Sequence, residues 1–318
     1  MAEYSNYPNG FTNGVTIRDI PIQIAHPGKV FWVNNSGVLP PGGVGGSNSN
    51  RGTFTHPFST IDYAIGKCTA SRGDIIMIMP GHEEDIAAAS GITLDVAGIA
   101  LVGLGTGDLR PTITFSETDS TFVISAANCS LVNMIFEAAV AEVVTAISLT
   151  AGADGLSFEH IESYEGAVAG TYNYVDFITA ATGANNLSFE DCKFIGNDTN
   201  NDAFFTGVAH DGFYVSNCYF ASNVAQAAVH GLLVSTGNIT NMVIRDSYFR
   251  SNVDGAAFID FDGAANSGLV CNCYFSSIDT AGAVTAGFDM TGAHCFECYV
   301  AGDADSFGLV GGGAVYTN

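Results

Sequence analysis

Hydrophobic and polar residues alternate in short runs that recur along the second half of the chain. Aligned on their last residue, seven copies of the run end at Phe136, Ser163, Phe194, Phe220, Phe249, Phe275 and Val300. Successive copies lie 25 to 31 residues apart, a spacing typical of one coil in a solenoid. The alternation has a period of two residues and not that of a helix, so the pattern predicts β-strands.

The copy that ends at Phe220 shows how one coil is organised. Phe213 and Val215 are two residues apart, as are Cys218 and Phe220, so each pair faces one side of a strand. The spacing of three between Val215 and Cys218 breaks the alternation and predicts a bend with Asn217 at its corner. Asn and Asp tolerate the left-handed backbone conformation that such a corner favours. Across the seven copies this corner column reads Asn133, His160, Asp191, Asn217, Asp246, Asn272 and Glu297.

The position two before the end of each copy is small or apolar. This inward column reads Met134, Ile161, Cys192, Cys218, Ser247, Cys273 and Cys298. Residues of this kind, stacked coil over coil, suit the interior of a narrow β-helix. We therefore predict an all-β fold, a single-stranded parallel β-helix over residues 75–310, with about nine coils of about 25 residues each.

Residues 1–50 do not follow the repeat and predict an N-terminal arm that ends in a linker. Its apolar residues at strand spacing are candidates for docking on a partner protein. These predicted contact residues are Val15, Ile17, Ile20, Ile22, Ile24, Val30, Phe31 and Trp32. Residues 40–50 are rich in Gly, Pro, Ser and Asn, which is typical of a flexible linker.

Two further segments flank the repeat. Residues 51–74 predict a short helix, because Pro57 suits a first helical turn and Ile61, Ala64 and Ile65 form an apolar stripe. Residues 311–318 begin with three glycines, too Gly-rich for a standard coil, and are predicted to form a C-terminal tail.

Composition narrows the possible functions. Of the 318 residues, 47% are hydrophobic and 13% are charged, the opposite of a disordered chain. Nine Lys and Arg against 32 Asp and Glu give a net charge of −23, which repels nucleic acid and anionic membranes. The start of the chain is polar and the apolar runs are short, so we expect no signal peptide and no transmembrane segment. Synthesis in a cytoplasm with reduced thiols follows.

A motif near the start of the repeat resembles a known fold family. PFSTIDYAI, at residues 57–65, is followed by GDIIMIMPG and then by ALVGLG. This succession resembles the opening of pectate-lyase-like right-handed parallel β-helices. The resemblance implies right-handed coils and makes residues 51–74 a capping segment, whose short helix covers the open end of the core. One fold hosts many chemistries, so it leaves the function open.

Carboxylates are the candidate catalytic groups, since glycosidases use two of them. Asp260 and Asp262 would face the same way on one strand, and Asp176, Asp211 and Asp289 are further candidates. The polygalacturonase motifs NTD, DD, GHG and RIK are absent as a set. The pattern thus favours a protein that is not an enzyme; if it is one, it would be a polysaccharide hydrolase or lyase.

Four cysteines near the end of the repeat offer thiolates for zinc. They are Cys271 and Cys273, with Cys295 and Cys298 one coil later. Three of them fall on inward positions and Cys271 falls at the corner, so we predict a ladder of buried thiols. Zinc and an inter-coil disulfide are the alternatives.

Other metal signals are weak. His82 precedes Glu83, Glu84 and Asp85, which suggests a cation site or, as we interpret it, a solvated loop. Calcium on outward Asp columns stays open, although no D-x-D-x-D-G loop occurs. We predict no metal and no cofactor.

The N-terminal half carries a second resemblance. NGVTIRDIPI, HPGKVFWVNNS, GGVGGS, RGT and PFSTIDYAIGKCTASRGDIIMIMPGH together resemble uncharacterised β-helix virion structural proteins of tailed bacteriophages. This resemblance implies a virion component made in the host cytoplasm, a homotrimer, and a partner such as the major capsid protein or another virion protein.

Two virion roles compete. The first is a capsid decoration or cement protein that attaches through its arm while the β-helix projects. The alternative is a tail spike or fibre that binds or degrades a host surface glycan. Tyr219, Tyr248 and Tyr274 share one outward column, which we interpret as a packing ladder or subunit contact, with glycan binding as the sharper hypothesis.

Overall fold

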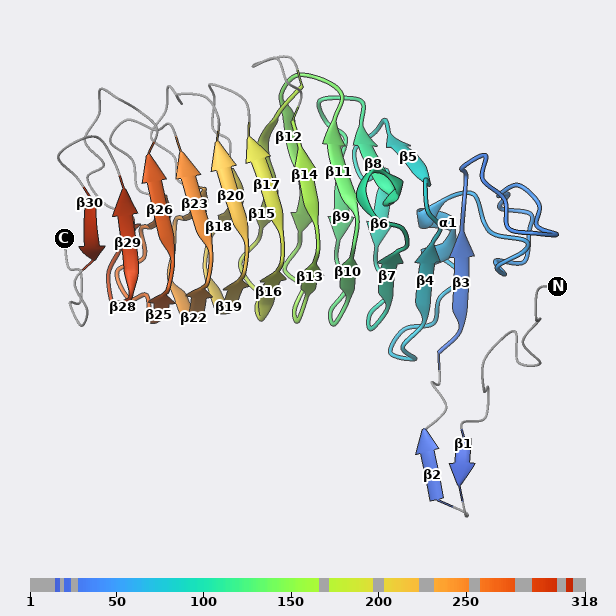
Figure 1. Ribbon diagram of the computed structural model, residues 1–318, viewed down its shortest axis with the longest axis horizontal. Coiled ribbons are helices and arrows are strands. Elements are labelled where there is room, and N and C mark those ends of the chain that lie inside the picture. Colours follow the sequence, from blue (N-terminus) through green and yellow to red (C-terminus); the bar gives the residue numbers. More distant parts are fainter. Residues whose placement is uncertain are drawn as a thin grey trace.

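Three β-sheets wind around one core and form a rod (Figure 1). The computed structural model describes residues 15–17, 20–23, 28–165, 172–196, 203–222, 232–251, 258–277, 288–301 and 307–310. Strands of successive coils pair in parallel as a right-handed β-solenoid, which confirms the predicted fold class. In the described part of the chain, no helix is long and apolar enough to cross a bilayer.

Each coil contributes one strand to each sheet. Sheet 1 runs in the order β28 (Ala293–Phe296), β25 (Gly268–Cys271), β22 (Ile239–Arg245), β19 (His210–Ser216), β16 (Leu187–Glu190), β13 (Ser157–Glu159), β10 (Ser130–Val132), β7 (Ala100–Gly103), β4 (Ile75–Ile78) and β3 (Val30–Val33). Sheet 2 runs in the order β30 (Phe307–Val310), β29 (Cys298–Ala301), β26 (Tyr274–Ser277), β23 (Tyr248–Ser251), β20 (Tyr219–Ser222), β17 (Lys193–Gly196), β14 (Glu162–Tyr164), β11 (Ile135–Ala138), β8 (Thr112–Phe115) and β5 (Glu83–Ile86). Sheet 3 runs in the order β27 (Phe288–Met290), β24 (Ile259–Phe261), β21 (Leu233–Ser235), β18 (Ala203–Gly207), β15 (Tyr174–Ala180), β12 (Val143–Leu149), β9 (Phe122–Ile124) and β6 (Ile92–Leu94).

The number of coils differs slightly from the prediction. Sheet 3 has eight strands, so the described residues form eight complete three-strand coils where about nine were expected. Strands β28 and β29 begin another coil, and β30 then pairs with β29 in the antiparallel direction. A 3-10 turn, Gly107–Leu109, lies between β7 and β8.

The corner column adopts the predicted conformation. All seven residues from Asn133 to Glu297 have positive φ, between 49° and 58°. Each corner turns the chain from sheet 1 into sheet 2 within a single residue. The backbone N–H groups of Asn217, Asp246 and Asn272 donate to carbonyl oxygens of the next coil at 3.2–3.3 Å. The hydrogen-bond ladder therefore continues around the corner.

The inward column and its neighbours build the core, as predicted. All seven inward residues from Met134 to Cys298 are buried. Alongside them, the phenylalanines that end successive copies are also buried, and the rings of Phe249 and Phe275 stack with centroids 5.0 Å apart. Ser163, the one Ser in that column, is fully buried too. Burial of stacked aromatic rings supplies much of the hydrophobic stabilisation of each coil.

The predicted capping helix is present as α1 (Ile61–Ile65), and its Ile61, Ala64 and Ile65 are buried. It packs against β3, β4 and β6 at the N-terminal end of the core. The first N–H of the helix, that of Ile61, donates to the carboxylate of Glu84, at 2.9 Å from Oε2. The charge of Glu84 thus caps the helix in place of a local side chain.

The prediction of a solvated loop at His82 is wrong. His82 is fully buried. Its Nε2 lies 3.0 Å from Oε2 of Glu84, and its Nδ1 accepts the N–H of Asn35 at 3.1 Å. The acceptor role of Nδ1 places the proton on Nε2, which donates to Glu84. The imidazole therefore connects the segment before the capping helix to the carboxylate that caps it.

The corner conformation gives a direct test of the fold. We expect Asn217→Val to lower the free energy of unfolding by about 1–2 kcal/mol, because a β-branched side chain is strained at positive φ. Asn217→Gly should cost much less, since Gly adopts this conformation freely. Urea unfolding followed by circular dichroism measures both changes.

The matched control is Ser188→Val, on the outer side of extended strand β16, where a β-branched residue is favourable. Equal destabilisation by the Val substitutions at positions 188 and 217 would contradict the assigned role of the corner.

Candidate functional site

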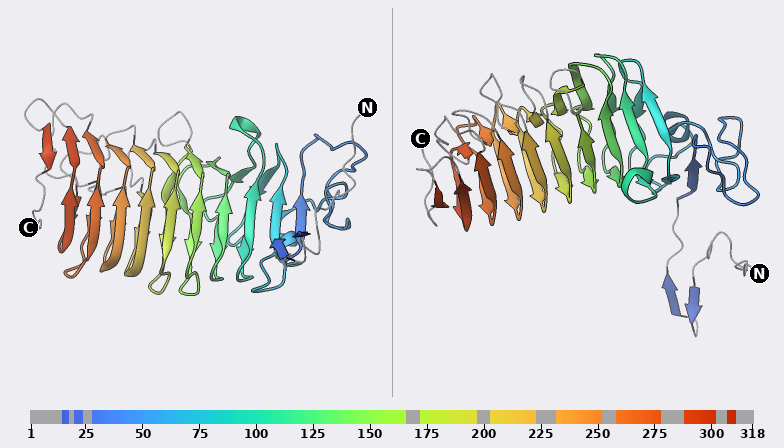
Figure 2. Two further views of the ribbon diagram at one scale, coloured as in Figure 1. Left: turned by 60° about the horizontal axis from the view of Figure 1, so that its bottom comes forward. Right: turned by 45° about the horizontal axis from the view of Figure 1, so that its top comes forward.

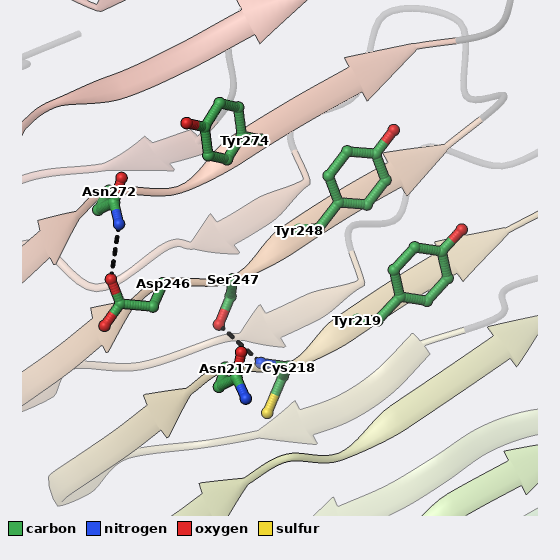
Figure 3. A pocket seen from close by; sticks show the side chains of 8 residues that line it. All are labelled: Asn217, Cys218, Tyr219, Asp246, Ser247, Tyr248, Asn272 and Tyr274. Atoms are coloured by element: carbon green, nitrogen blue, oxygen red, sulfur yellow. Dashed lines mark hydrogen bonds between the residues drawn. The ribbon is translucent and has the colours of Figure 1, made fainter.

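A hollow lies beside the corner column on the outside of the rod, where sheet 1 turns into sheet 2 (Figure 3). Its volume is about 290 Å³, at the lower end for small-molecule sites. Three successive coils line it, each with a corner residue and a tyrosine, and the first two coils also with an inward residue. The lining residues are Asn217, Cys218, Tyr219, Asp246, Ser247, Tyr248, Asn272 and Tyr274.

The predicted tyrosine column is one wall of this hollow. Tyr219, Tyr248 and Tyr274 occupy equivalent positions on β20, β23 and β26, and Tyr299 on β29 continues the column. Sequence reasoning missed Tyr299, although it precedes the last residue of its copy as the other three do. Tyr274 and Tyr299 are 48% and 43% exposed, so the column reaches the surface.

The tyrosines stack in two pairs rather than in one continuous ladder. The rings of Tyr219 and Tyr248 are 5.3 Å apart and inclined by 6°, and those of Tyr274 and Tyr299 are 5.3 Å apart and inclined by 12°. Tyr248 and Tyr274 are neighbours in register, yet Figure 3 shows their rings turned in different directions. The hollow lies where the stacking is interrupted, beside Tyr248 and Tyr274.

Polar groups form the opposite wall. The side-chain amide of Asn272 donates to Oδ1 of Asp246 at 2.7 Å, and the amide of Asn217 donates to Asp191. At the floor, Ser247 Oγ accepts the N–H of Cys218 at 3.1 Å. Asp246 is the one charged residue among the eight that line the hollow.

The nearest basic side chain is already engaged. Arg245 Nη1 pairs with Oδ2 of Asp246 at 3.2 Å. Its Nε donates to the hydroxyl of Tyr214 at 2.9 Å, and its guanidinium lies 5.5 Å from the centre of that ring. The positive charge is therefore held on the sheet 1 side of the corner.

An ionic cluster that the sequence analysis missed lies further along the same outer column of sheet 2. The carboxylate of Glu162 accepts hydrogen bonds from Arg110 and Lys193, although the three residues come from different coils. The signal was present in the repeat, because Glu162 and Lys193 occupy the position that is tyrosine in later copies.

The pKa values of Glu162 and Tyr164 in this cluster are shifted from their ordinary values. Burial acts to raise the pKa of Glu162, but hydrogen bonds from Lys193, Tyr164 and Arg110 outweigh it and lower that pKa. Burial and the bond to Glu162 raise the pKa of Tyr164 to about 12. All of these donors hold Glu162 as a carboxylate, which is suited to joining coils.

The predicted catalytic carboxylates are placed on two sheets. Asp260 is half-buried on β24, and Asp262 is exposed just after that strand. Asp176 lies on β15 of the same sheet and accepts a hydrogen bond from Thr206, whereas Asp211 lies on β19 of sheet 1.

The other two candidates lie on different sheets, Asp211 on β19 of sheet 1 and Asp289 on β27 of sheet 3. Two hydrogen bonds, from Thr240 and Asn241, lower the pKa of Asp211 and occupy its carboxylate. Asp289 is in backbone register with Asp260, and its side chain lies outside the described part of the chain. A catalytic role for Asp260 and Asp262 stays a prediction.

The predicted arm divides into two parts. Strands β1 (Val15–Ile17) and β2 (Ile20–Gln23) pair antiparallel with each other and belong to none of the three solenoid sheets. The side chains of Val15, Ile17, Ile20 and Ile22, and the whole of Ile24, lie outside the described part of the chain.

Strand β3 instead joins the rod. Its residues Val30, Phe31 and Trp32 pair in parallel with β4, so the solenoid begins before residue 75. Trp32 meets the Phe54 ring edge-on at 4.9 Å, and Phe31 lies 5.9 Å from the Phe58 ring. These contacts fix β3 at the N-terminal end of the core.

The predicted linker is likewise attached to that end. Val44 and Ser47 donate backbone N–H groups to Thr55 and Pro57, and Asn48 accepts the N–H of Ser59. Residues 40–50 thus form part of the structure around α1.

The cysteine placement agrees with the alignment. Cys273, Cys295 and Cys298 are buried, Cys271 is partly exposed, and all are free thiols. Further along the same inward column, burial raises the pKa of the Cys192 thiol well above its usual value. A buried thiol of this kind is a poor nucleophile and behaves as a core residue.

The Glu162 cluster predicts a pH-dependent contribution to stability. A carboxylate whose pKa is lowered by folding stabilises the protein above about pH 4.5, its ordinary value, and loses that effect as the pH falls through the folded pKa. We expect Glu162→Gln to lower the free energy of unfolding by about 1 kcal/mol at pH 7. The difference from wild type should shrink below pH 4.5.

Urea unfolding at a series of pH values measures this difference. Glu137→Gln, an exposed carboxylate on neighbouring strand β11, is the control and should change little at any pH. If Glu162→Gln lowers the free energy of unfolding by the same amount at every pH, the cluster acts through packing and not through charge.

Comparison with known proteins supports the fold and little beyond it. No protein-family model matches the chain, and no curated protein matches it. Among solved structures, a pectin methylesterase mutant in complex with a hexasaccharide has a TM-score of 0.50 and 16% identity, over 87% of this chain and 90% of that chain. A rhamnogalacturonan lyase has a TM-score of 0.36 and 17% identity, over 88% of this chain and 64% of that chain. ORF18 of Geobacillus virus E2 has a TM-score of 0.38 and 15% identity, over 80% and 62%. The likeness to the pectin methylesterase shows a pectate-lyase-like β-helix.

Proposed function

We propose that this chain is a structural protein of a phage virion, a capsid decoration or cement protein, held by its N-terminal hairpin while the solenoid projects. The observation that carries the proposal is the separation of β1 and β2 from every solenoid sheet. Figure 1 and the right-hand view of Figure 2 show this hairpin standing away from the rod at its capped end. A two-stranded hairpin is marginal in water by itself and gains stability by pairing with another surface.

The sequence supports the identity of that surface. The resemblance of segments within residues 13–82 to β-helix virion proteins points to the major capsid protein or another virion protein as the partner, and to a homotrimer as the assembled form. Hydrophobic residues alternate along β1 and β2, which suits a strand pair with one face on a partner. The rod then extends away from the attachment point.

A tail spike or fibre is the second candidate function. The hollow beside the tyrosine column favours it, because aromatic and amide groups meet there on the outside of the rod. Degradation of polysaccharide has less support, since Asp176, Asp211 and Asp260 do not gather into one paired-carboxylate site. New reducing ends or unsaturated uronates after incubation with host polysaccharide would favour a spike enzyme.

The attachment proposal is tested by removing the hairpin and keeping β3. We expect a chain that lacks residues 1–27 to retain its β-sheet circular dichroism and its thermal unfolding transition, because every solenoid strand remains. It should fail to bind particles that lack the protein, as measured by co-sedimentation. Density of bound full-length protein on the shell or on the tail, seen by electron microscopy, distinguishes the two roles.

The matched control is a surface substitution on the rod, Ser188→Asp, in the full-length chain. It should bind particles as wild type does. Undiminished binding of the truncated chain would refute attachment through the hairpin.

A further inference from the structure

The break in the tyrosine column leaves aromatic surface uncovered at a polar hollow. In each stacked pair, one ring covers the face of the other. Tyr248 and Tyr274 are not paired in this way, and their rings diverge around the hollow (Figure 3). Ring faces that other rings do not cover are available to stack against a ligand.

The same hollow presents hydrogen-bonding groups at the surface. The hydroxyls of Tyr219, Tyr248 and Tyr274 bond to no other residue in the described part of the chain. Asn272 uses its amide N–H₂ on Asp246, which leaves its carbonyl oxygen facing the exterior as an acceptor. Hydroxyl donors and acceptors therefore lie beside apolar ring faces, an arrangement that matches a ligand with both kinds of surface.

Charge decides which ligands fit. The hollow has one carboxylate, Asp246, and no Lys, Arg or His among its lining residues. Arg245 is engaged by Asp246 and Tyr214. The chain as a whole carries a net charge of −23. A uronate or phosphate group would find no counter-charge here, so the ligand is uncharged.

The repeat of the site indicates a linear ligand. A corner residue and a tyrosine recur on three successive coils, as Asn217 with Tyr219, Asp246 with Tyr248 and Asn272 with Tyr274. Coils are separated by about 4.8 Å, the spacing of neighbouring strands. A hexose unit in an extended chain has a similar length, so successive sugars can meet equivalent groups. A protein partner is a poorer fit, because specific protein interfaces need a much larger surface.

We propose that this corner hollow binds an uncharged hexose polysaccharide laid along the rod, with Tyr248 and Tyr274 as stacking platforms and Asp246 and Asn272 as hydroxyl ligands. The inference deepens the second candidate function, on which it rests, by naming the class of glycan and the residues that would hold it. The site is on sheets 1 and 2, away from Asp260 on sheet 3.

Isothermal titration calorimetry on the full-length protein tests this site. The probes are maltohexaose, cellohexaose and mannohexaose, with hexagalacturonic acid as the anionic counterpart. We expect at least one neutral hexasaccharide to bind, and hexagalacturonic acid to bind more weakly or not at all. Tyr248→Ala and Tyr274→Ala should each lower the affinity for the neutral sugar by about tenfold. Tyr274→Phe keeps the ring and should keep most of the affinity.

Tyr172→Ala is the matched control, since Tyr172 is 45% exposed but lies outside the hollow. It should bind as wild type does, and circular dichroism checks that every variant is folded. The proposal would be overturned if none of the three neutral probes binds, or if the acidic probe binds more tightly than they do. It would also be overturned if Tyr274→Ala binds the neutral sugar as tightly as wild type does. So would a change of oligomeric state in Tyr274→Ala with unchanged sugar binding, which would make this face a contact between copies. None of these outcomes bears on whether the hairpin attaches the rod.

Discussion

The whole rod depends on one backbone constraint, the left-handed corner residue that turns the chain from sheet 1 into sheet 2. A single residue at positive φ lets the N–H of Asn217 donate to the carbonyl of Arg245 in the next coil, so the hydrogen bonds between coils continue across the corner. Because the same turn recurs in every copy, each side chain around it falls into a straight column. The core, the tyrosine column and the hollow are three consequences of that alignment.

The sequence predicted those features that repeat. The corner residues and the inward column follow from spacing alone, because each position must satisfy the same local geometry in every coil. The capping role of the helix with Ile61, Ala64 and Ile65 came instead from the resemblance to known β-helices. The burial of His82 could not be read in this way. It depends on Asn35, which comes from a segment 47 residues earlier and outside the repeat. Strand β3 likewise joins sheet 1, although its sequence is not a copy of the repeated run.

The site was predicted in outline and not in detail. The outward column of Tyr219, Tyr248 and Tyr274 was visible in the alignment, but ring orientation is a side-chain property that spacing does not encode. The same limit applies to the catalytic candidates. Asp260 and Asp262 are two residues apart in the sequence, but spacing along one strand does not say which side chains of other coils lie near them. The corner between sheets 1 and 2 is therefore a better candidate site than the carboxylates on sheet 3.

The Glu162 cluster has a mechanical consequence. In a stack of coils, each layer normally contacts only its two neighbours, so force applied at one end peels layers off in sequence. Arg110 lies just before β8 and Glu162 begins β14, so their ion pair passes over the coil that contains β11. A link that skips a layer ties three layers into one block, and Lys193 adds a fourth. A rod pulled from its ends would therefore resist peeling most strongly in the coils that contain β8, β11, β14 and β17, and the coils on either side of this block would yield first.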